Sequence, residues 1–246
     1  MKLINLNVEI DLHYERVFDF LRSEDPDVIT LQEATDHYRS ELEQAGYFVS
    51  YVPRLKKMSV TGEITDGELI ATRVSHTLTD HLYYDHGHKD LQFEDEANRR
   101  ETNHEGLLIA EFDQADTHFI LCTTHFTWTP KGELACDDQK ADMQAFLDFT
   151  TKLPPHILTG DFNIPRHHNE LYDVLAEHYI DNVPATYESS MDPTLHKHRN
   201  NPELQKLFND FMVDYVFTQS PYTATDVRLE FGISDHAAVI AEIGKR

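Results

Sequence analysis

Short apolar runs recur along the whole chain, and longer segments with a different spacing of apolar residues lie between them. Alternation or a short continuous apolar run is the pattern of a β-strand. These runs predict strands at residues 2–8, 28–31, 47–52, 68–73, 106–112, 118–125, 155–159, 212–217, 226–230 and 237–243.

The longer segments repeat their apolar residues at helical spacing, which predicts helices with one buried face each. The apolar stripes consist of Tyr14, Val17, Phe18 and Leu21, then Met143, Phe146 and Leu147, and then Leu171, Val174 and Leu175. Acidic residues at 137 and 138 favour a helix start there, and Asn169 is the predicted N-cap of the third helix. Residues 34–45 predict a further helix that stops at Gly46.

No Gly/Ser-rich or Pro-rich linker, internal repeat or low-complexity tract interrupts the 246 residues. We therefore expect a single domain over residues 1–246, with ample length for a substantial core. Around ten strands with interspersed helices are typical of a mixed α/β domain with more than one sheet layer.

Polar side chains of a few types stand at or near the ends of several predicted strands. They are Asn7, Glu33, His125, Asp161, Asn163, Asp214, Asp235 and His236. In layered α/β folds, strand ends are where side chains distant in the sequence converge. One such residue is usually a turn former or a cap, but this many of them indicate a shared site.

Six ordered motifs carry these residues: LNV, LQEA, TTHF, LTGDFN, VDYVF and ISDHAAV. Together they resemble the endonuclease/exonuclease/phosphatase superfamily, which has the DNase I-like fold. The motifs run from Asn7 to His236, so the resemblance covers almost the whole chain. It implies a four-layer α/β/β/α sandwich in which two packed mixed β-sheets are flanked by helices.

The resemblance also implies a divalent-metal site for Mg²⁺, with Mn²⁺ as an alternative. Glu33 matches the principal ligand, a hard oxygen donor of the kind that Mg²⁺ prefers. Asn7 and Asp235 match its neighbours in the metal shell. Glu9 stands where some DNA-repair members carry Asp, so an auxiliary metal role is expected of it.

The remaining motif residues match catalytic roles in that superfamily. Asp161 matches the residue that orients or deprotonates the attacking water, and Asn163 matches the amide that binds the scissile phosphate. His236 matches the histidine that stabilises the transition state or acts as acid/base. Asp214 matches the carboxylate that holds this imidazole, and His125 matches a second histidine that contacts phosphate oxygens.

Taken singly, several of these residues have a plainer interpretation. GDFN alone predicts a turn capped by Asp161, and Glu33 also suits the start of a following helix. Asp214 is more telling, because a carboxylate inside an apolar strand is costly without a partner. His236 is the natural candidate for that partner.

Two arginines are candidates for contacts with a substrate phosphate. Arg73 ends the segment GELIATR, and Arg166 directly follows GDFNIP. A surface loop is the alternative interpretation for Arg166. The histidines of DHLYYDHGHKD, at residues 80–90, resemble a metal cluster, but their Asp-rich and Gly-containing context favours a solvated loop.

The charge balance of the chain narrows the range of expected substrates. Lys and Arg number 21 against 44 Asp and Glu, a formal net charge of −23. Such a field repels polyanions and disfavours a non-specific duplex nuclease. We expect a phosphodiesterase or nuclease that cleaves nucleic acid or a nucleotide-like ester by in-line water attack. A phosphatase of a small phosphorylated metabolite or of an inositol or lipid head group is the alternative, and a catalytically silent metal-binding interaction module is a third possibility.

The N-terminal segment carries acids and polar groups where a signal peptide requires an apolar run. No apolar stretch approaches the ~20 residues of a membrane-spanning helix. We expect a cytoplasmic protein without stable membrane association, and the sequence indicates no obligate protein partner. Cys122 and Cys136 are the only cysteines, and whether they pair stays open, although a cytoplasmic location disfavours a disulfide.

Overall fold

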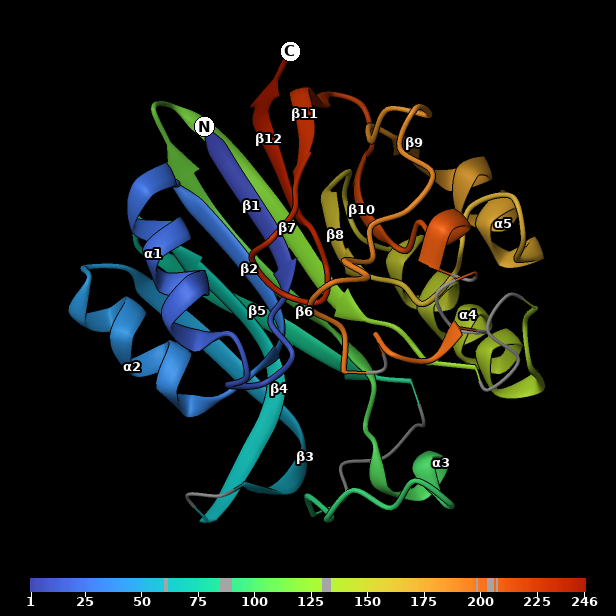
Figure 1. The fold of residues 1–246 in the computed structure, drawn as a ribbon. Helices are drawn as coiled ribbons and strands as arrows, with labels where there is room; N and C mark the ends of the chain where they lie inside the picture. The colour runs from blue at the N-terminus through green and yellow to red at the C-terminus, as the bar shows by residue number, and fades with distance from the viewer. Residues whose placement is uncertain (60–61, 85–89, 130–133, 198, 203–205, 207) are drawn as a thin grey trace.

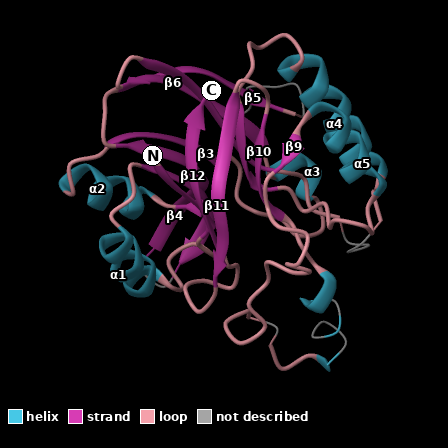
Figure 2. Ribbon diagram, turned by 90° about the horizontal axis from the view of Figure 1, so that it is seen from above, coloured by secondary structure: helices cyan, strands magenta, loops and turns pink. Residues whose placement is uncertain are grey.

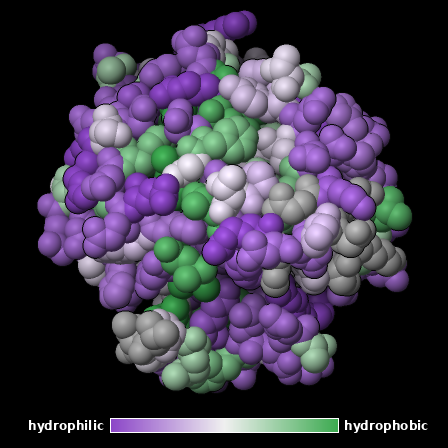
Figure 3. Space-filling view, in the orientation of Figure 1, coloured by the Kyte–Doolittle hydropathy of each residue, from purple (hydrophilic) through white to green (hydrophobic). Residues whose placement is uncertain are grey.

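The computed structural model describes residues 1–59, 62–84, 90–129, 134–197, 199–202, 206 and 208–246. Its strands form two six-stranded mixed sheets that pack face to face, and helices cover the outer face of each sheet (Figures 1 and 2). This is the four-layer α/β/β/α sandwich that the motifs implied. The face in Figure 3 is mostly hydrophilic, with apolar residues in scattered areas between polar ones.

The first sheet has the strand order β11-β12-β1-β2-β4-β3. Its strands are β1 (Lys2–Asn7), β2 (Val28–Ala34), β3 (Phe48–Ser59), β4 (Gly62–Thr72), β11 (Tyr222–Glu230) and β12 (Ala238–Lys245). Only β1 and β2 are parallel; the other neighbours are antiparallel. Helices α1 (Tyr14–Glu24) and α2 (Asp36–Gln44) cover this sheet.

The second sheet has the order β5-β6-β7-β8-β10-β9, with β7 and β8 as its only parallel pair. Its strands are β5 (His76–Tyr83), β6 (Gly106–Gln114), β7 (Thr117–His125), β8 (Ile157–Asp161), β9 (Ile180–Asp181) and β10 (Asp214–Thr218). Helices α4 (Asp137–Thr150) and α5 (Glu170–His178) cover its outer face (Figure 1). The short helix α3 (Arg99–Thr102) precedes β6, and a 3-10 turn covers Phe208–Asp210.

The interface between the sheets contains a buried row of hydrogen-bonded polar side chains. Alternate residues of a strand face opposite sides, so Ile4 and Leu6 pack under α1 whereas Asn5 faces the other sheet. Bonds that cross between the sheets in this row include those from Gln32 Nε2 to Thr123 Oγ1 and from Thr159 Oγ1 to Thr30 Oγ1, each at 3.0 Å. By the same alternation, Asn7 extends this polar row to the ends of the strands.

Most predicted elements are present, but several boundaries differ. The predicted strands at 47–52 and 68–73 belong to a longer hairpin, in which β3 runs to Ser59 and β4 begins at Gly62. The predicted cap is confirmed, since Asn169 Oδ1 accepts the N–H of Leu171 at 3.0 Å.

The prediction of a solvated loop around His81 was wrong, because His81 lies in β5. This edge strand exposes polar residues on both sides and so lacks the apolar alternation that marks a strand. His86 and His88, in the same histidine-rich stretch, lie outside the described residues.

Both cysteines are free, and Cys122 is buried in the core as expected. Within the described ranges, every helix is too short or too polar to cross a bilayer.

Candidate active site

Strand pairing brings three of the predicted catalytic residues side by side. His125 at the end of β7 pairs with Asp161 at the end of the parallel strand β8. Asp214 at the start of β10 pairs with the same Asp161 across an antiparallel ladder. From the other sheet, Asn7 at the end of β1 donates from Nδ2 to Asp161 Oδ2 at 3.0 Å. The site therefore lies where strands of both sheets end, as expected for a layered α/β fold.

Asp161 is the centre of this arrangement. Its Oδ1 accepts the backbone N–H of Asn163 at 2.9 Å. Its Oδ2, besides the bond from Asn7, lies 3.6 Å from His125 Nε2 and 3.7 Å from His236 Nε2. Burial raises the pKa of Asp161, and the neighbouring Asp214 carboxylate raises it further. A buried carboxylate with a raised pKa is suited to accept a proton.

His236 is held by Asp214. Its Nδ1 lies 2.7 Å from Asp214 Oδ2, and both side chains are buried. Burial alone would lower the pKa of His236, but the carboxylates of Asp214 and Asp161 outweigh it and raise this pKa well above its usual value. This confirms that the carboxylate inside an apolar strand has the histidine partner that physical chemistry requires.

The pKa of His125 shifts in the opposite direction to that of His236. Burial, aided by the positive charge of Arg54, lowers the pKa of His125 to about 4. Its Nδ1 is buried, and no described residue hydrogen-bonds to it. The two histidines that flank Asp161 therefore differ, since His125 is neutral near pH 7 and His236 favours the charged form.

The local backbone is strained where it presents these side chains. Glu33 and Asn163 have φ angles of 53° and 51°, which non-glycine residues rarely adopt. Gly160 has φ 146°, and a Cβ there would lie 2.0 Å from the carbonyl oxygen of Thr124. Only glycine allows β8 to approach β7 this closely. The turn interpretation of GDFN is thus also correct, because Asp161 accepts the N–H two residues on.

Asn163 is partly committed to holding this turn. Its Nδ2 donates to the carbonyl oxygen of Phe126 at 2.9 Å, and the residue is 8% exposed. One N–H of the amide and its oxygen stay available for a ligand.

Three carboxylates collect beside Asn7. Burial raises the pKa of Glu9 and of Asp235, that of Asp235 to about 7. Repulsion from Glu33 adds to both shifts, and repulsion from Glu9 adds to that of Asp235. Within the described part of the chain, Glu9 Oε1 is buried without a hydrogen-bond partner. Crowded carboxylates with an unpartnered oxygen are what a hard divalent cation such as Mg²⁺ binds. The residues present therefore fit such a cation.

Asn7 would have to turn its amide to become an oxygen ligand in this cluster. Its Nδ2 faces Glu33 Oε1 at 3.5 Å and also Asp161, whereas its Oδ1 accepts the N–H of Glu9. A half-turn of the amide would present Oδ1 to a cation and give up both the bond from Glu9 and the bond to Asp161.

Among the described residues, the group with the spacing of a cation site is a different one. Ligand atoms of Asp161, Asp214 and His236 lie within 4.8 Å of one another. The bond between His236 and Asp214 already occupies one nitrogen and one carboxylate oxygen of this group, although Asp214 Oδ1 is buried without a partner in the described ranges. The three carboxylates beside Asn7 offer oxygen donors alone, which suits Mg²⁺ better than a set with an imidazole.

Sequence analysis missed two cations beside Glu33. Arg54 is buried, binds Asp66 through Nε and Nη2 and Glu105 through Nη1, and its Nη2 lies 3.9 Å from Glu33 Oε1. Lys57 Nζ lies 2.8 Å from Asp66 and 3.9 Å from Glu33 Oε2. Their positive charges outweigh the effect of burial and lower the pKa of Glu33. The basic segment PRLKK was the only signal for them in the sequence.

Both arginines predicted to contact phosphate are bound to protein groups in this structure. Arg73 follows Thr72, which pairs with Val28 at the far end of β2 from Glu33. Its guanidinium lies 3.9 Å over the ring of Tyr47 and 2.5 Å from Asp25, so its position gives the predicted phosphate contact no support.

The position of Arg166 likewise gives its predicted phosphate contact no support, because its guanidinium is bound inside the protein. The residue is 6% exposed. Its Nη1 donates to Asp181 Oδ2 and to the carbonyl oxygen of Val183, both at 3.0 Å, and Nη2 donates to the carbonyl of Tyr187 at 2.9 Å. The surface-loop alternative fails for the same reason.

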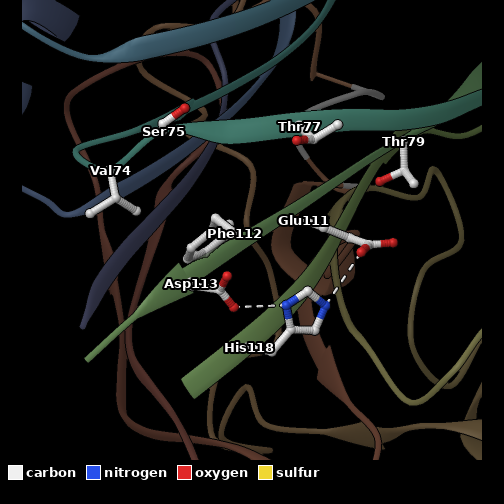
Figure 4. A pocket seen from close by; sticks show the side chains of 8 residues that line it. All are labelled: Val74, Ser75, Thr77, Thr79, Glu111, Phe112, Asp113 and His118. Atoms are coloured by element: carbon white, nitrogen blue, oxygen red, sulfur yellow. Dashed lines mark hydrogen bonds and ion pairs between the residues drawn. The ribbon is translucent and has the colours of Figure 1, made fainter. Parts of the chain in front are cut away.

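A cavity of about 470 Å³ lies away from these residues, over β5, β6 and the start of β7. His118 stands at the opposite end of β7 from His125, with its two nitrogens facing Glu111 at 3.3 Å and Asp113 at 2.9 Å (Figure 4). Because both nitrogens already face carboxylates at the exposed surface, this cavity offers no group poised for chemistry.

The sequence matches the model of the "Endonuclease/Exonuclease/phosphatase family" over residues 4–236. A comparison with curated proteins found no match. Similar solved structures include an endonuclease/exonuclease/phosphatase from Beutenbergia cavernae DSM 12333, with a TM-score of 0.73 at 15% identity over 100% of this chain and 71% of that one. The human Nocturnin catalytic domain with bound sulfate has a TM-score of 0.67 at 16% identity, covering 100% and 93%. TDP2 of D. rerio complexed with a single-strand DNA product has a TM-score of 0.69 at 15% identity, over 100% of this chain and 99% of that one. At these identities the likeness shows the fold.

Proposed function

Because the chain belongs to the endonuclease/exonuclease/phosphatase family, whose members hydrolyse phosphoester bonds, we propose that it is a divalent-metal-dependent phosphodiesterase. Its substrate is a nucleic acid or a nucleotide-like ester. One observation carries the proposal: Asp161 Oδ2 accepts the amide of Asn7 and faces the Nε2 atoms of His125 and His236. Asp161 as the base therefore lies next to two imidazoles, and Asn7 connects it to the carboxylate cluster.

Asp161 orients the attacking water and accepts its proton. The bond from the Asn163 N–H fixes the carboxylate, so the water is held in one direction for in-line attack on phosphorus. Its pKa, raised by burial, makes it a stronger base than an exposed carboxylate.

The two histidines and Asn163 surround the place where negative charge grows. The bond between His236 Nδ1 and Asp214 leaves Nε2 directed into the site, where an N–H donor stabilises a developing oxyanion. Neutral His125 offers its Nε2 from the opposite flank, and Asn163 offers its free amide N–H to a phosphate oxygen.

Glu33, Asp235 and Asn7 would hold the cation, with Glu9 as a further oxygen donor. When bound there, the cation would neutralise charge on the phosphate oxygens and on the leaving group. Arg54 and Lys57 keep Glu33 ionised and therefore ready as a ligand.

The test compares bis-p-nitrophenyl phosphate with p-nitrophenyl phosphate, with Mg²⁺, with Mn²⁺ and with EDTA. We expect metal-dependent release of p-nitrophenol from the diester and its loss in Asp161→Ala. Faster hydrolysis of the monoester would assign a phosphatase instead. Metal binding without turnover of either ester or of a wider phosphoester panel would assign a silent interaction module.

A further inference from the structure

The sole tryptophan of the chain is exposed three residues after His125. Trp128 is 42% exposed. Its neighbours are anchored: Thr127 Oγ1 donates to Asp142, and the carbonyl of Thr127 accepts Gln139 Nε2 at 2.7 Å. An exposed aromatic ring on a fixed backbone has little conformational entropy to lose when a ligand stacks on it.

A cation from another element covers one face of this ring. The Arg99 guanidinium of α3 lies 4.6 Å from the centre of the Trp128 ring. The next residue, Arg100, donates to Asp142 at 2.5 Å, and Asp142 also accepts the bond from Thr127. The same carboxylate therefore fixes α3 and the tryptophan segment relative to each other.

Ion pairs connect this ring to the carboxylate cluster of the active site. Arg99 Nη2 lies 3.9 Å from Glu94 Oε1, and Glu94 Oε2 lies 3.7 Å from Lys57 Nζ. Lys57 Nζ is in turn 3.9 Å from Glu33 Oε2. Trp128 and Glu33 thus stand at two ends of one contiguous row of side chains.

A second exposed aromatic residue lies off this row. Phe93 is 46% exposed, and Lys56 Nζ lies 5.7 Å from its ring centre. Phe93 is bridged to Lys56 and Glu94 faces Lys57, so strand alternation directs Phe93 and Lys56 to the face opposite the row. We call Trp128 and Arg99 the stacking platform.

We propose that the stacking platform binds the unpaired bases of a single-stranded nucleic acid whose backbone enters the active site. An exposed aromatic ring beside a cation is how proteins hold single strands, with a base stacked on the ring and a phosphate beside the cation. Bases of a duplex have no free face to offer, and a net charge of −23 disfavours extended phosphate contacts. The inference rests on the proposed function, since it names the substrate class of that site.

The test uses the single tryptophan as its own reporter. The full-length protein, in EDTA to prevent hydrolysis, is titrated with a short single-stranded DNA oligonucleotide, its RNA counterpart, the matching duplex and inorganic polyphosphate. Stacking of a base on Trp128 quenches its fluorescence, so we expect saturable quenching by one or both single strands and much weaker quenching by the duplex and by polyphosphate. No quenching by either single strand, or equal quenching by duplex or polyphosphate, would overturn the proposal.

Variants separate the stacking platform from general surface effects. By fluorescence anisotropy of a labelled single strand, Trp128→Ala should raise Kd by roughly fivefold or more, the worth of one stacked base. Phe93→Ala and Phe48→Ala are the matched controls, since Phe93 is 46% exposed on the opposite face and Phe48 is 49% exposed but pairs with Thr72 at the far end of the sheet. An unchanged Kd in Trp128→Ala would refute the assignment.

The proposed hydrolysis and the proposed single-strand binding can be refuted independently of each other. Metal-dependent hydrolysis of bis-p-nitrophenyl phosphate without single-strand binding would leave the proposed function in place and remove the stacking platform. Single-strand binding without hydrolysis of any phosphoester would do the reverse.

Discussion

Nδ1 of His236 lies 2.7 Å from Oδ2 of Asp214, and this bond directs the other ring nitrogen at Asp161. The two residues are 22 positions apart: Asp214 begins β10, and His236 lies just before β12. Their bond determines which nitrogen of the imidazole is available to a substrate. Most of the expected chemistry depends on that orientation.

Asp214→Asn should lower kcat by about 100-fold or more while changing KM little. The amide keeps the shape of the carboxylate but no longer holds His236 in the orientation and tautomer that place an N–H at the reacting oxygen. Steady-state hydrolysis of bis-p-nitrophenyl phosphate measures both constants. Asp113→Asn is the control, because Asp113 contacts Nδ1 of the exposed His118 at 2.9 Å in a similar way. Wild-type turnover in Asp214→Asn would contradict the assigned role.

Glu33→Gln should weaken the binding of Mg²⁺ and Mn²⁺. A cation that binds only the folded chain stabilises it by about 2.7 kcal/mol at a hundred times its Kd, so wild-type Tm should rise on adding metal and that rise should shrink in the variant. Isothermal titration calorimetry gives the affinities directly. Glu63→Gln, at a half-exposed pair with Lys56, serves as the control. If Asp214→Asn loses metal and Glu33→Gln does not, the cation instead occupies the group of Asp161, Asp214 and His236.

Arg166→Met should cost about 3–5 kcal/mol of the free energy of unfolding. The change leaves the largely buried Asp181 without its cation and several carbonyl oxygens without a donor. Arg73→Met should cost only about 1 kcal/mol or less, because Arg73 and Asp25 form an exposed pair. Urea unfolding measures both values. Equal costs for the two variants would show that Arg166 does not act as a buried structural residue.

Acidification should destabilise the protein in part through His156. This imidazole is fully buried, with Nδ1 at 2.9 Å from Pro154 O and Nε2 at 2.9 Å from the Tyr179 hydroxyl. Burial lowers the pKa of His156, so below pH ~6.5 the unfolded chain takes up a proton more readily than the folded one. The free energy of unfolding should therefore fall as the pH falls from ~6.5 toward the folded pKa, and be unaffected by this group above that window.

Urea unfolding near neutral pH and at mildly acidic pH measures the effect. The difference between the two values should be smaller in His156→Gln than in the wild type. It should stay unchanged in His37→Gln, where the side chain is 64% exposed. The same pH difference in His156→Gln as in the wild type would exclude a contribution from His156.

The local pattern of apolar and polar residues was sufficient to predict much of the fold. Apolar periodicity placed the helices and the central strands, because those elements bury one face or both. It missed β5, an exposed edge strand, and the long extension of the β3–β4 hairpin, where polar residues replace the apolar alternation. The ordered polar residues at the strand ends were enough to predict the site, and strand pairing brings His125, Asp161 and Asp214 together.

Only the tertiary structure determined which charged side chains lie close to that site. Arg54 and Lys57 both approach Glu33, although an odd spacing in a regular strand would direct them to opposite faces. A shift of register between Pro53 and Leu55 makes this possible. Arg73 lies at the far end of the sheet, and the guanidinium of Arg166 is hydrogen-bonded to groups inside the protein. The sequence by itself thus determined the elements and the reacting groups, because both follow from local periodicity and motif order. The surroundings of those groups depend on register, bulges and long-range pairing, which no local pattern encodes.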